Sequence, residues 1–326
     1  MRFPLIAASA KPTRASRGQA PLLSLPGVLL DKVPKPMRIA DLLQRGRPTI
    51  SFEFMAPRDE SEVDVLERTI AALAGHAPDW VSVTYRVRTG EKTLELVTRI
   101  KRHYHVEAMA HLTCANTADR TRQILNWMER EGVANVLALR GDPPSAGEPF
   151  VPADPRLTHA SDLIELVRGS GYRFGIGGAC SAEKHPESPD QEHELRYMKL
   201  KVDSGADFLI TQLFFDNAFY FDLVRRARAA GITVPIVPGL MPVPSRRSLG
   251  VMTTMSGATV PSELQSEIDD APDDETIRSI GVRHCIRQCA ELLEAGVPGL
   301  HFYTFNRAKA PTEILSALRG QQLIAS

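Results

Sequence analysis

Residues 49–55 read TISFEFM, and this stretch decides the fold. Six of the seven residues suit a β-strand that is buried on both faces. The exception is Glu53. Because an ionised carboxylate is costly to bury, a glutamate in such a strand is usually paired, protonated or functional. The sequence therefore predicts that Glu53 is a proton donor at the end of a buried strand. The alternative is a buried salt bridge, for instance with Arg307.

Strand-like and helix-like patterns alternate outward from this stretch. After a short helix over 37–44, the predicted strands are 49–55, 79–84, 106–112, 134–139, 173–179, 207–212, 233–237 and 299–304. The predicted helices between them are 60–75, 91–103, 117–131, 161–169, 190–204, 217–230 and 275–295. Residues 245–274 break the rhythm and predict helices within an insertion. Eight strands with intervening helices indicate an α/β protein, a (β/α)8 TIM barrel.

One barrel accounts for most of the chain. A length of 326 residues is normal for this fold, and a hydrophobic content of 43% is enough for a large core. We predict an N-terminal arm and lead-in helix over 1–48 and a single catalytic barrel over 49–320. Residues 1–30 are basic and have no signal-type apolar core. A disordered or surface-wrapping arm is the favoured interpretation, and a transit peptide is the alternative.

Charge and cysteine content exclude several classes of partner. Lys plus Arg and Asp plus Glu both number 39, so no net charge favours nucleic acid or an anionic membrane. No apolar run reaches the ~18 residues that a membrane span needs. The four cysteines form no CxxC pair and no zinc set, which fits a reducing cytoplasm. We expect a cytoplasmic protein that binds a small molecule and no metal, as a monomer or a homo-oligomer.

Chemistry in a barrel belongs at the C-terminal ends of the strands. Candidate side chains follow nearly every predicted strand, which suggests a single occupied site. They are Glu53, Thr84, Tyr85, His111, Arg140, Gly141, Asp142, His185, Gln212, Phe215, His301, Tyr303 and Arg307. Most have a structural alternative: Asp142 could pair with Arg140, and Phe215 could belong to the core. Neither a GxGxxG nor a Walker A loop occurs, so a nucleotide would not be held in the Rossmann manner.

Several of these stretches resemble the methylenetetrahydrofolate reductase family. They occur in the family's order, cover about residues 49–310, and are highly specific only when taken together. The matching pieces are SFEF (51–54), VSVTY (81–85), HLTC (111–114), ALRGD (138–142), HPE (185–187), KVDSGAD (201–207), TQLFFD (211–216), PGLMP (238–242) and HFYTFNR (301–307). The arm before residue 48 lies outside the resemblance.

The resemblance implies a barrel that reduces 5,10-methylenetetrahydrofolate to 5-methyltetrahydrofolate with NADH or NADPH. By this likeness Glu53 matches the catalytic glutamate and Asp142 matches the aspartate beside the pterin. Gln212 matches a folate-binding glutamine and Arg307 a substrate-binding arginine. Tyr303 and Phe215 are the other expected substrate contacts. The expected cofactor contacts are Thr84, Tyr85, His111, Arg140, Gly141, His185 and Lys201.

The chemistry of these side chains agrees with the assigned roles. The five-membered ring of the substrate must open to an iminium cation before a hydride can reach its methylene carbon. Opening requires a proton on the leaving nitrogen, and Glu53, kept protonated by an apolar strand, can supply it. Asp142, if it stays ionised, would stabilise the cation. Gln212 offers both a donor and an acceptor to the amide edge of the pterin.

The flavin side departs from the family pattern. Most members relay the hydride through FAD, and small residues usually stand where the flavin approaches. Here Arg86-Val87 replace a Gly-Ala pair and Ser181 replaces a tyrosine. In the following helix, Glu194, Tyr197 and Leu200 replace Asp, Asn and Arg, while Lys201 is retained. These changes favour the family's flavin-free branch, in which NADH reduces the substrate directly.

Three alternatives stay open. FAD could still bind through Arg140, His185 and Lys201. Ser248 stands where family members often carry a substrate-contacting glutamine. The neighbouring Arg246 and Arg247 could meet the glutamate tail of folate or a phosphate, or form a solvated turn. A catalytically silent folate-binding barrel is the remaining possibility, although an intact Glu53 argues against it.

Overall fold

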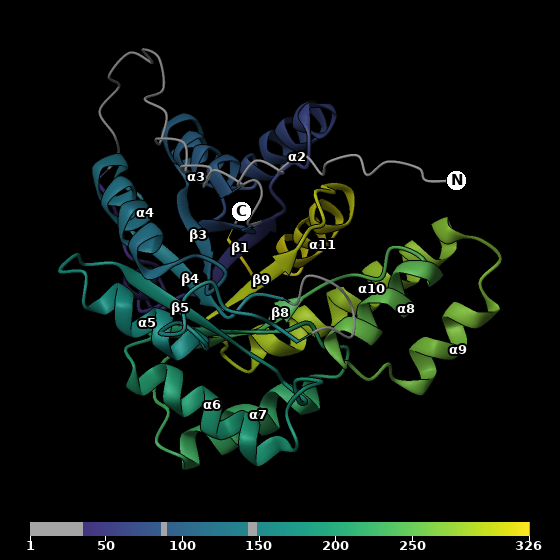
Figure 1. Ribbon diagram of the computed structural model, residues 1–326. Helices are drawn as coiled ribbons and strands as arrows, with labels where there is room; N and C mark the ends of the chain where they lie inside the picture. The colour runs from purple at the N-terminus through teal and green to yellow at the C-terminus, as the bar shows by residue number, and fades with distance from the viewer. Residues whose placement is uncertain (1–34, 86–89, 143–148, 326) are drawn as a thin grey trace, which may run out of the picture. The chain divides into compact units, whose positions relative to one another are not determined.

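The computed structural model describes residues 35–85, 90–142 and 149–325 (Figure 1). A sheet of parallel strands forms its centre. The strands are β1 Thr49–Phe54, β2 Trp80–Val83, β3 Glu107–Thr113, β4 Asn135–Leu139, β5 Gly175–Cys180, β6 Phe208–Thr211, β7 Ile236–Val237, β8 Gly239–Leu240 and β9 Gly299–Tyr303. Their order is β7-β6-β5-β4-β3-β2-β1-β9-β8, so neighbours in sequence are neighbours in space.

The sheet closes on itself through a strand in two pieces. Pro238 separates β7 from β8, β7 pairs with β6, and β8 pairs with β9. Proline has no backbone N–H to give to a ladder, so the pairing is interrupted there. Counted as one, β7 and β8 are the predicted seventh strand, and the predicted (β/α)8 barrel is confirmed.

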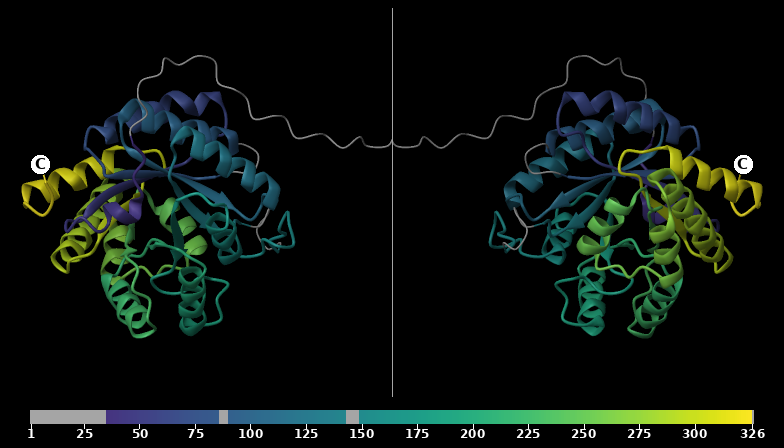
Figure 2. Two further views of the ribbon diagram at one scale, coloured as in Figure 1. Left: turned by 90° about the vertical axis from the view of Figure 1, so that its left-hand side faces the viewer. Right: turned by 90° about the vertical axis from the view of Figure 1, so that its right-hand side faces the viewer.

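Helices follow the strands as the sequence pattern predicts. They are α1 Ile39–Leu42, α2 Val63–Ala74, α3 Gly90–Arg99, α4 Ala118–Glu131, α5 Ala160–Arg168, α6 Gln191–Asp203, α7 Asn217–Ala229, α8 Arg246–Ser256, α9 Ser262–Asp270, α10 Asp274–Glu294 and α11 Lys309–Gly320. The side views show these helices packed around the strands (Figure 2). Helices α8 and α9 form the predicted insertion, whereas α11 was not among the predicted helices. Side-chain oxygens of Thr117, Asp190, Asp216, Ser245 and Asp273 cap the starts of five helices.

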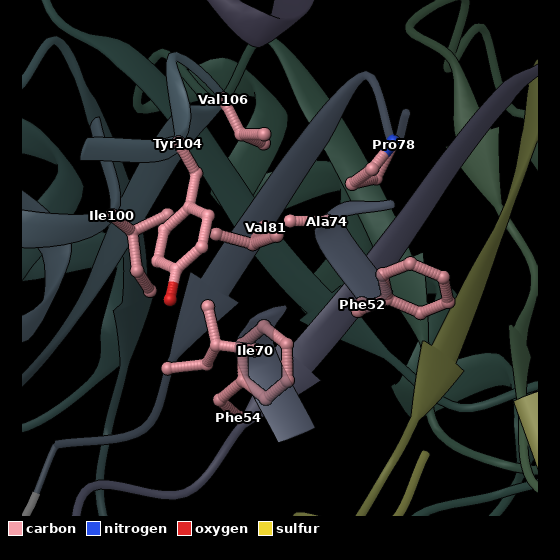
Figure 3. Close-up of a pocket in the computed structure, with 9 residues that line it drawn as sticks. All are labelled: Phe52, Phe54, Ile70, Ala74, Pro78, Val81, Ile100, Tyr104 and Val106. Carbon is pink, nitrogen blue, oxygen red and sulfur yellow. The ribbon is translucent and has the colours of Figure 1, made fainter. Parts of the chain in front are cut away.

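The hydrophobic core has separate layers inside and outside the strand wall. The inner layer contains Trp80, Met109, Leu137 and Phe208, and α1 packs against it. The outer layer lies between the strands and the helices. It encloses a small apolar cavity of about 10 Å³ that Phe52, Phe54 and Tyr104 help to line (Figure 3). A cavity this small without convergent polar groups is a packing defect and not a binding site.

Buried polar contacts fix the lead-in segment at the N-terminal end of the barrel. Lys101 Nζ lies 2.7 Å from both carboxylate oxygens of Glu107, and both side chains are buried. The same carboxylate accepts the backbone N–H of Met37 at 3.0 Å and the Asn135 amide at 3.3 Å. Asn135 also accepts the N–H of Ile39 at 2.8 Å. This network ties the segment before β1 to β3 and β4.

Within the described ranges, no helix is long and apolar enough to cross a membrane. All four cysteines are free and buried. No group of three or more His, Cys, Asp or Glu side chains could hold a metal ion in that part of the chain. The predicted arm before residue 35 and the Arg86-Val87 departure lie outside the described residues, and the boundary at residue 48 stays a prediction.

Candidate active site

Glu53 lies inside the barrel, near the C-terminal end of β1. Its Oε2 is 3.4 Å from Nε2 of His111 on β3 and 3.7 Å from Nε2 of His301 on β9. Because β2 separates β1 from β3, the first of these contacts can form only across the barrel interior. The hydroxyl of Ser82 on β2 is 3.5 Å from the same oxygen. The ion-pair partners that the described residues offer to Glu53 are thus histidines, and not Arg307.

His301 is held in one orientation. Its ring is fully buried and stacks on Trp80 with centroids 4.9 Å apart and an interplanar angle of 11°. Tyr303 packs edge-on against it at 5.3 Å. Nδ1 of His301 lies 2.9 Å from the hydroxyl of Ser51. Within the described part of the chain, Nε2 is buried without a hydrogen-bond partner and faces Glu53.

The electrostatics of Glu53 differ from the sequence prediction. Burial by itself would raise the pKa of Glu53. The nearby His111 and His301, together with Ser82, lower this pKa by more than burial raises it, so it lies below its ordinary value. Burial lowers the pKa of His111, which favours a neutral ring, and the charge of Glu53 opposes this only in part. An apolar strand alone therefore does not keep Glu53 protonated. The contacts of Glu53 with His111, His301 and Ser82, which the sequence pattern did not predict, set the direction of its pKa.

The turn after β9 is clamped to the backbone around Glu53. The hydroxyl of Thr304 donates to the carbonyl of Glu53 at 2.6 Å. The side chain of Asn306 accepts from the N–H of Met55 and donates to its carbonyl, both at 2.9 Å. Phe305 and Asn306 have φ angles of 47° and 57°, which are uncommon for residues other than glycine. The clamp holds this strained turn, and with it the exposed Phe305, at the rim of the mouth.

The predicted substrate contacts have different environments. Asp142 and Arg307 are exposed at strand ends. Gln212 is exposed, its Oε1 accepts the N–H of Leu213 at 2.9 Å, and the residues that the structure describes leave its amide NH2 available to donate. Tyr303 donates its hydroxyl to the carbonyl of Thr211 at 2.7 Å, which makes it a wall of the mouth.

Phe215 does not fit its predicted role as a substrate contact. Its side chain is 1% exposed and packs in a hydrophobic cluster with Leu249 and Met252 of α8 and with Leu264 of α9. The insertion covers the ring, so the core alternative describes it. Arg246 is likewise structural, because its guanidinium donates to the carbonyls of Ile268 and Ala271 at the end of α9.

Most of the predicted cofactor contacts make internal bonds. Arg140 forms a two-pronged ion pair with Glu187, at 2.5 and 3.0 Å. Lys201 Nζ donates to the carbonyl of Ala179 at 2.7 Å. Nδ1 of His185 accepts the N–H of Glu187 at 3.2 Å. The loop after β5 therefore uses these side chains to hold its own shape.

Glu194, one of the departures from the family pattern, organises the same loop. Its buried carboxylate accepts the backbone N–H groups of Ser181 and His185 at 3.2 and 3.4 Å, and the hydroxyl of Ser188 at 2.9 Å. On the outer face of α6, Tyr197 and Leu200 are 42% and 53% exposed. The exposed face of α6 next to this loop thus carries the apolar groups Tyr197 and Leu200, and the acid Glu194 is buried beneath the loop.

Thr84, Tyr85 and Gly141 complete the rim. The hydroxyl of Thr84 accepts the N–H of Ala56, and the hydroxyl of Tyr85 donates to Asn116 at 3.0 Å. Gly141 has a φ of 94°, and a Cβ there would lie 3.2 Å from the side chain of Thr113. These residues shape the backbone around the mouth, and their predicted cofactor contacts remain predictions.

The sequence pattern made His301 a strand-end candidate, but it did not predict His301, Ser51 or Ser82 as neighbours of Glu53. A signal existed, since side chains alternate along a strand and His301 shares its parity with Tyr303. What the pattern could not give is the register: Glu53 pairs with Ser82 and Tyr303, and Ser51 pairs with His301. Register places these groups at two adjacent levels of the barrel, with Ser51 and His301 two residues below the level of Glu53, Ser82 and Tyr303.

The fold and this cluster define a (β/α)8 barrel with a buried acid, flanked by histidines, at its catalytic end. The family model for methylenetetrahydrofolate reductase matches residues 38–319. The chain is also 35% identical, over 279 residues, to the 5,10-methylenetetrahydrofolate reductase of Escherichia coli (strain K12), covering 84% of this chain and 92% of that protein. It belongs to the methylenetetrahydrofolate reductase family.

Two further likenesses add detail. The chain is 34% identical over 295 residues to the protein named methylenetetrahydrofolate reductase (NADH) 1 of Zea mays, covering 86% of this chain. It spans about half the length of such plant relatives, 50% in this case. A Clostridium thermocellum protein, described as binding two copies of 5-methyl-5,6,7,8-tetrahydrofolic acid, superposes with a TM-score of 0.58 at 15% identity, covering 88% of this chain and 100% of that one. This last likeness supports the barrel fold alone.

Proposed function

We propose that this protein reduces 5,10-methylenetetrahydrofolate to 5-methyltetrahydrofolate with NADH as the hydride donor. The observation that carries the proposal is Glu53, which lies partly buried at the mouth of the barrel against two histidines. Membership of the family supports the reaction, and the plant relatives named as NADH-dependent support the donor. The free, buried cysteines are consistent with a cytoplasmic location.

Glu53 would deliver the proton that opens the five-membered ring. The side chain of Glu53 is 16% exposed, enough to meet a substrate atom at the mouth while staying largely shielded from bulk water. Asp142, which is exposed at the end of β4, would stabilise the iminium cation by its negative charge. The free amide donors of Gln212 would hold the pterin, and Arg307 would pair with the anionic end of folate.

The loop after β5 supports hydride transfer without a flavin. A bound FAD would need cations for its diphosphate, and Arg140 and Lys201 are already engaged by Glu187 and by a backbone carbonyl. The buried Glu194 would repel a diphosphate placed there. The residues therefore do not fit FAD in this arrangement. Direct reduction by NADH is the proposed route, with NADPH as the alternative donor.

The test is anaerobic oxidation of NADH by the purified protein with methylenetetrahydrofolate and no added flavin. An absorption spectrum first establishes that the protein is colourless. Stoichiometric oxidation supports both the reaction and the flavin-free route. Turnover only after FAD is added would keep the reaction and overturn the route. If neither condition gives turnover, the chain is a non-catalytic folate-binding barrel and the proposal fails.

A further inference from the structure

The hydroxyl of Ser51 determines which ring nitrogen of His301 carries hydrogen. Its Oγ lies 3.1 Å from the carbonyl of Leu300 and 2.9 Å from Nδ1 of His301. A hydroxyl has one hydrogen to donate, and a carbonyl can only accept. Both contacts are satisfied when Ser51 donates to Leu300 and accepts a hydrogen from Nδ1. His301 is then protonated at Nδ1.

This tautomer leaves Nε2 of His301 pointing at Glu53. Nε2 is buried, has no hydrogen-bond partner among the described residues, and lies 3.7 Å from Oε2 of Glu53. Without a further hydrogen, the lone pair of Nε2 would face a carboxylate in a site with little water, which is unfavourable. One proton between the two atoms removes the repulsion. It can reside on Glu53 or on the ring.

The surroundings of His301 suit a ring that carries this proton and does not turn. Stacking on Trp80 at 4.9 Å places the ring over an indole face, which attracts a cation. Tyr303 blocks rotation from the edge, at 83° to the ring. The 3.7 Å separation is long for a hydrogen bond, and such bonds often tighten only when substrate binds.

We propose that His301 is a positioning residue that keeps one proton between its Nε2 and Oε2 of Glu53, in the tautomer that Ser51 fixes. The inference deepens the proposed function, because this proton is the one that opens the ring of the substrate. The proton passes from Glu53 to the leaving nitrogen as the carbon–nitrogen bond breaks, and the electron pair of that bond receives it. Glu53 is left ionised beside neutral His301. Water restores the proton once product has left.

Other groups that face Glu53 do not take over this task. Nε2 of His111 on β3 is also buried without a hydrogen-bond partner among the described residues and lies 3.4 Å from Oε2 of Glu53, but burial lowers the pKa of His111 and favours its neutral ring. Tyr303 on β9 keeps its hydrogen, because burial raises its pKa well above the ordinary value. Ser82 on β2 does not titrate in the accessible range, and its hydroxyl can only donate to or accept from the carboxylate.

The first experiment compares the pH dependence of turnover in the wild type, His301→Gln and Ser51→Ala. Glutamine keeps a hydrogen-bonding amide but cannot hold a proton. At high pH the lone pair of Nε2 faces Oε2 of Glu53 and disfavours the ionised carboxylate, and glutamine removes this effect, so we expect the fall of kcat toward high pH to begin at lower pH. His301→Gln should be slowed about tenfold or more at pH 8 but only about threefold at pH 6, with KM nearly unchanged. Ser51→Ala should shift in the same direction by less.

The matched control is His103→Gln, which removes an exposed histidine at the other end of the barrel. It should follow the wild type at every pH. A loss in His301→Gln that is equal at all pH values would indicate a merely structural role and would overturn the inference. An unchanged pH profile would overturn it as well.

The second experiment needs no turnover and no substrate. Long-range nitrogen-15 NMR of the protein with labelled histidine identifies the tautomer of His301, whose signal is assigned by its absence in His301→Gln. We expect hydrogen on Nδ1 at neutral pH, and a mixture of tautomers in Ser51→Ala. A neutral ring with hydrogen on Nε2 would refute the inference even if the enzyme is active. The expected tautomer in a wild type that oxidises no NADH would refute the proposed function and leave the proton arrangement standing.

Discussion

The two ends of this barrel each bury a glutamate, and the two carboxylates are treated differently. Glu107, at the N-terminal end, receives both contacts from Lys101, a backbone N–H and an amide. Glu53, at the C-terminal end, faces two histidines at 3.4 and 3.7 Å and has no cationic Lys or Arg beside it among the described residues. Because the partners of Glu107 all stabilise its ionised form, protonation of this carboxylate would be unfavourable. Glu53 has fewer such partners, so it can exchange a proton more readily.

The comparison shows how to separate a structural acid from a reactive one when both are buried. Judged by burial alone, Glu107 would be the stronger candidate for the reactive acid, since its side chain is 4% exposed and that of Glu53 is 16% exposed. The number and charge of the partners instead favour Glu53 as the reactive acid. Three predictions test this distinction.

The largest effect is expected for Glu53→Gln. Glutamine keeps the shape of the side chain but cannot donate an acid proton, so turnover of methylenetetrahydrofolate should fall by roughly 10²–10⁴-fold while substrate binding is mostly kept. Steady-state kinetics and a binding titration measure the two quantities. The midpoint of chemical unfolding should stay near that of the wild type. Near-normal turnover would make Glu53 structural and the mechanism wrong.

Glu107→Gln should have the reverse profile. The change leaves the ammonium group of Lys101 buried without its counter-charge, which typically costs about 3–5 kcal/mol of unfolding free energy. Urea denaturation measures this loss, and activity per folded molecule should be preserved. The matched control is the double variant Lys101→Met/Glu107→Gln, which removes both charges and should recover much of the stability. If the single variant is as stable as the wild type, the ion pair does not hold this end together.

The smallest effect concerns stability and pH. Burial lowers the pKa of His111 below its ordinary value of 6.5, so the unfolded chain binds a proton at a pH where the folded protein does not. The free energy of unfolding should therefore fall as the pH drops from 6.5 toward the lower folded pKa. His111→Gln should flatten part of this slope. His76 and His284, whose pKa values burial also lowers, should retain the rest.

Urea titrations at several pH values between 7.5 and 5 would measure that slope. The double variant Lys101→Met/Glu107→Gln serves as the comparison at the other end of the barrel, since it removes no histidine and leaves no unpaired buried charge. Its stability should depend on pH with the slope of the wild type. A slope that is the same in His111→Gln as in the wild type would show that His111 is not held neutral by the fold.

The fold was largely predictable because the period of the hydrophobic pattern and the length of each apolar run distinguish strands from helices. Residues 49–55 and the other apolar runs match β1 to β6 and β9 within two residues at each end. The seventh strand was harder, since Pro238 divides it and only β7 lies in the range 233–237. Helix α11 was missed although Pro311 stands in its first turn, where proline is tolerated.

The site was predictable as a set of positions but not as a set of contacts. Strand-end reasoning found Glu53 and His111, which the structure brings together. It also gave Phe215 a substrate role, because aromatic residues after a strand look alike whether or not an insertion covers them. The environment of Glu53 depends on strand register, and register follows from closure of the whole barrel.

The break at Pro238 gives the barrel wall a seam. On either side of it, β7 and β8 each pair with a neighbouring strand through only two residues. Two hydrogen bonds connect the strands across this seam. Tyr303 on β9 donates its hydroxyl to the carbonyl of Thr211 on β6. The N–H of Gly239 donates to the hydroxyl of Thr211. Tyr303 also lines the mouth and packs against the ring of His301. Separation of the strands at this seam would therefore also displace the groups around Glu53.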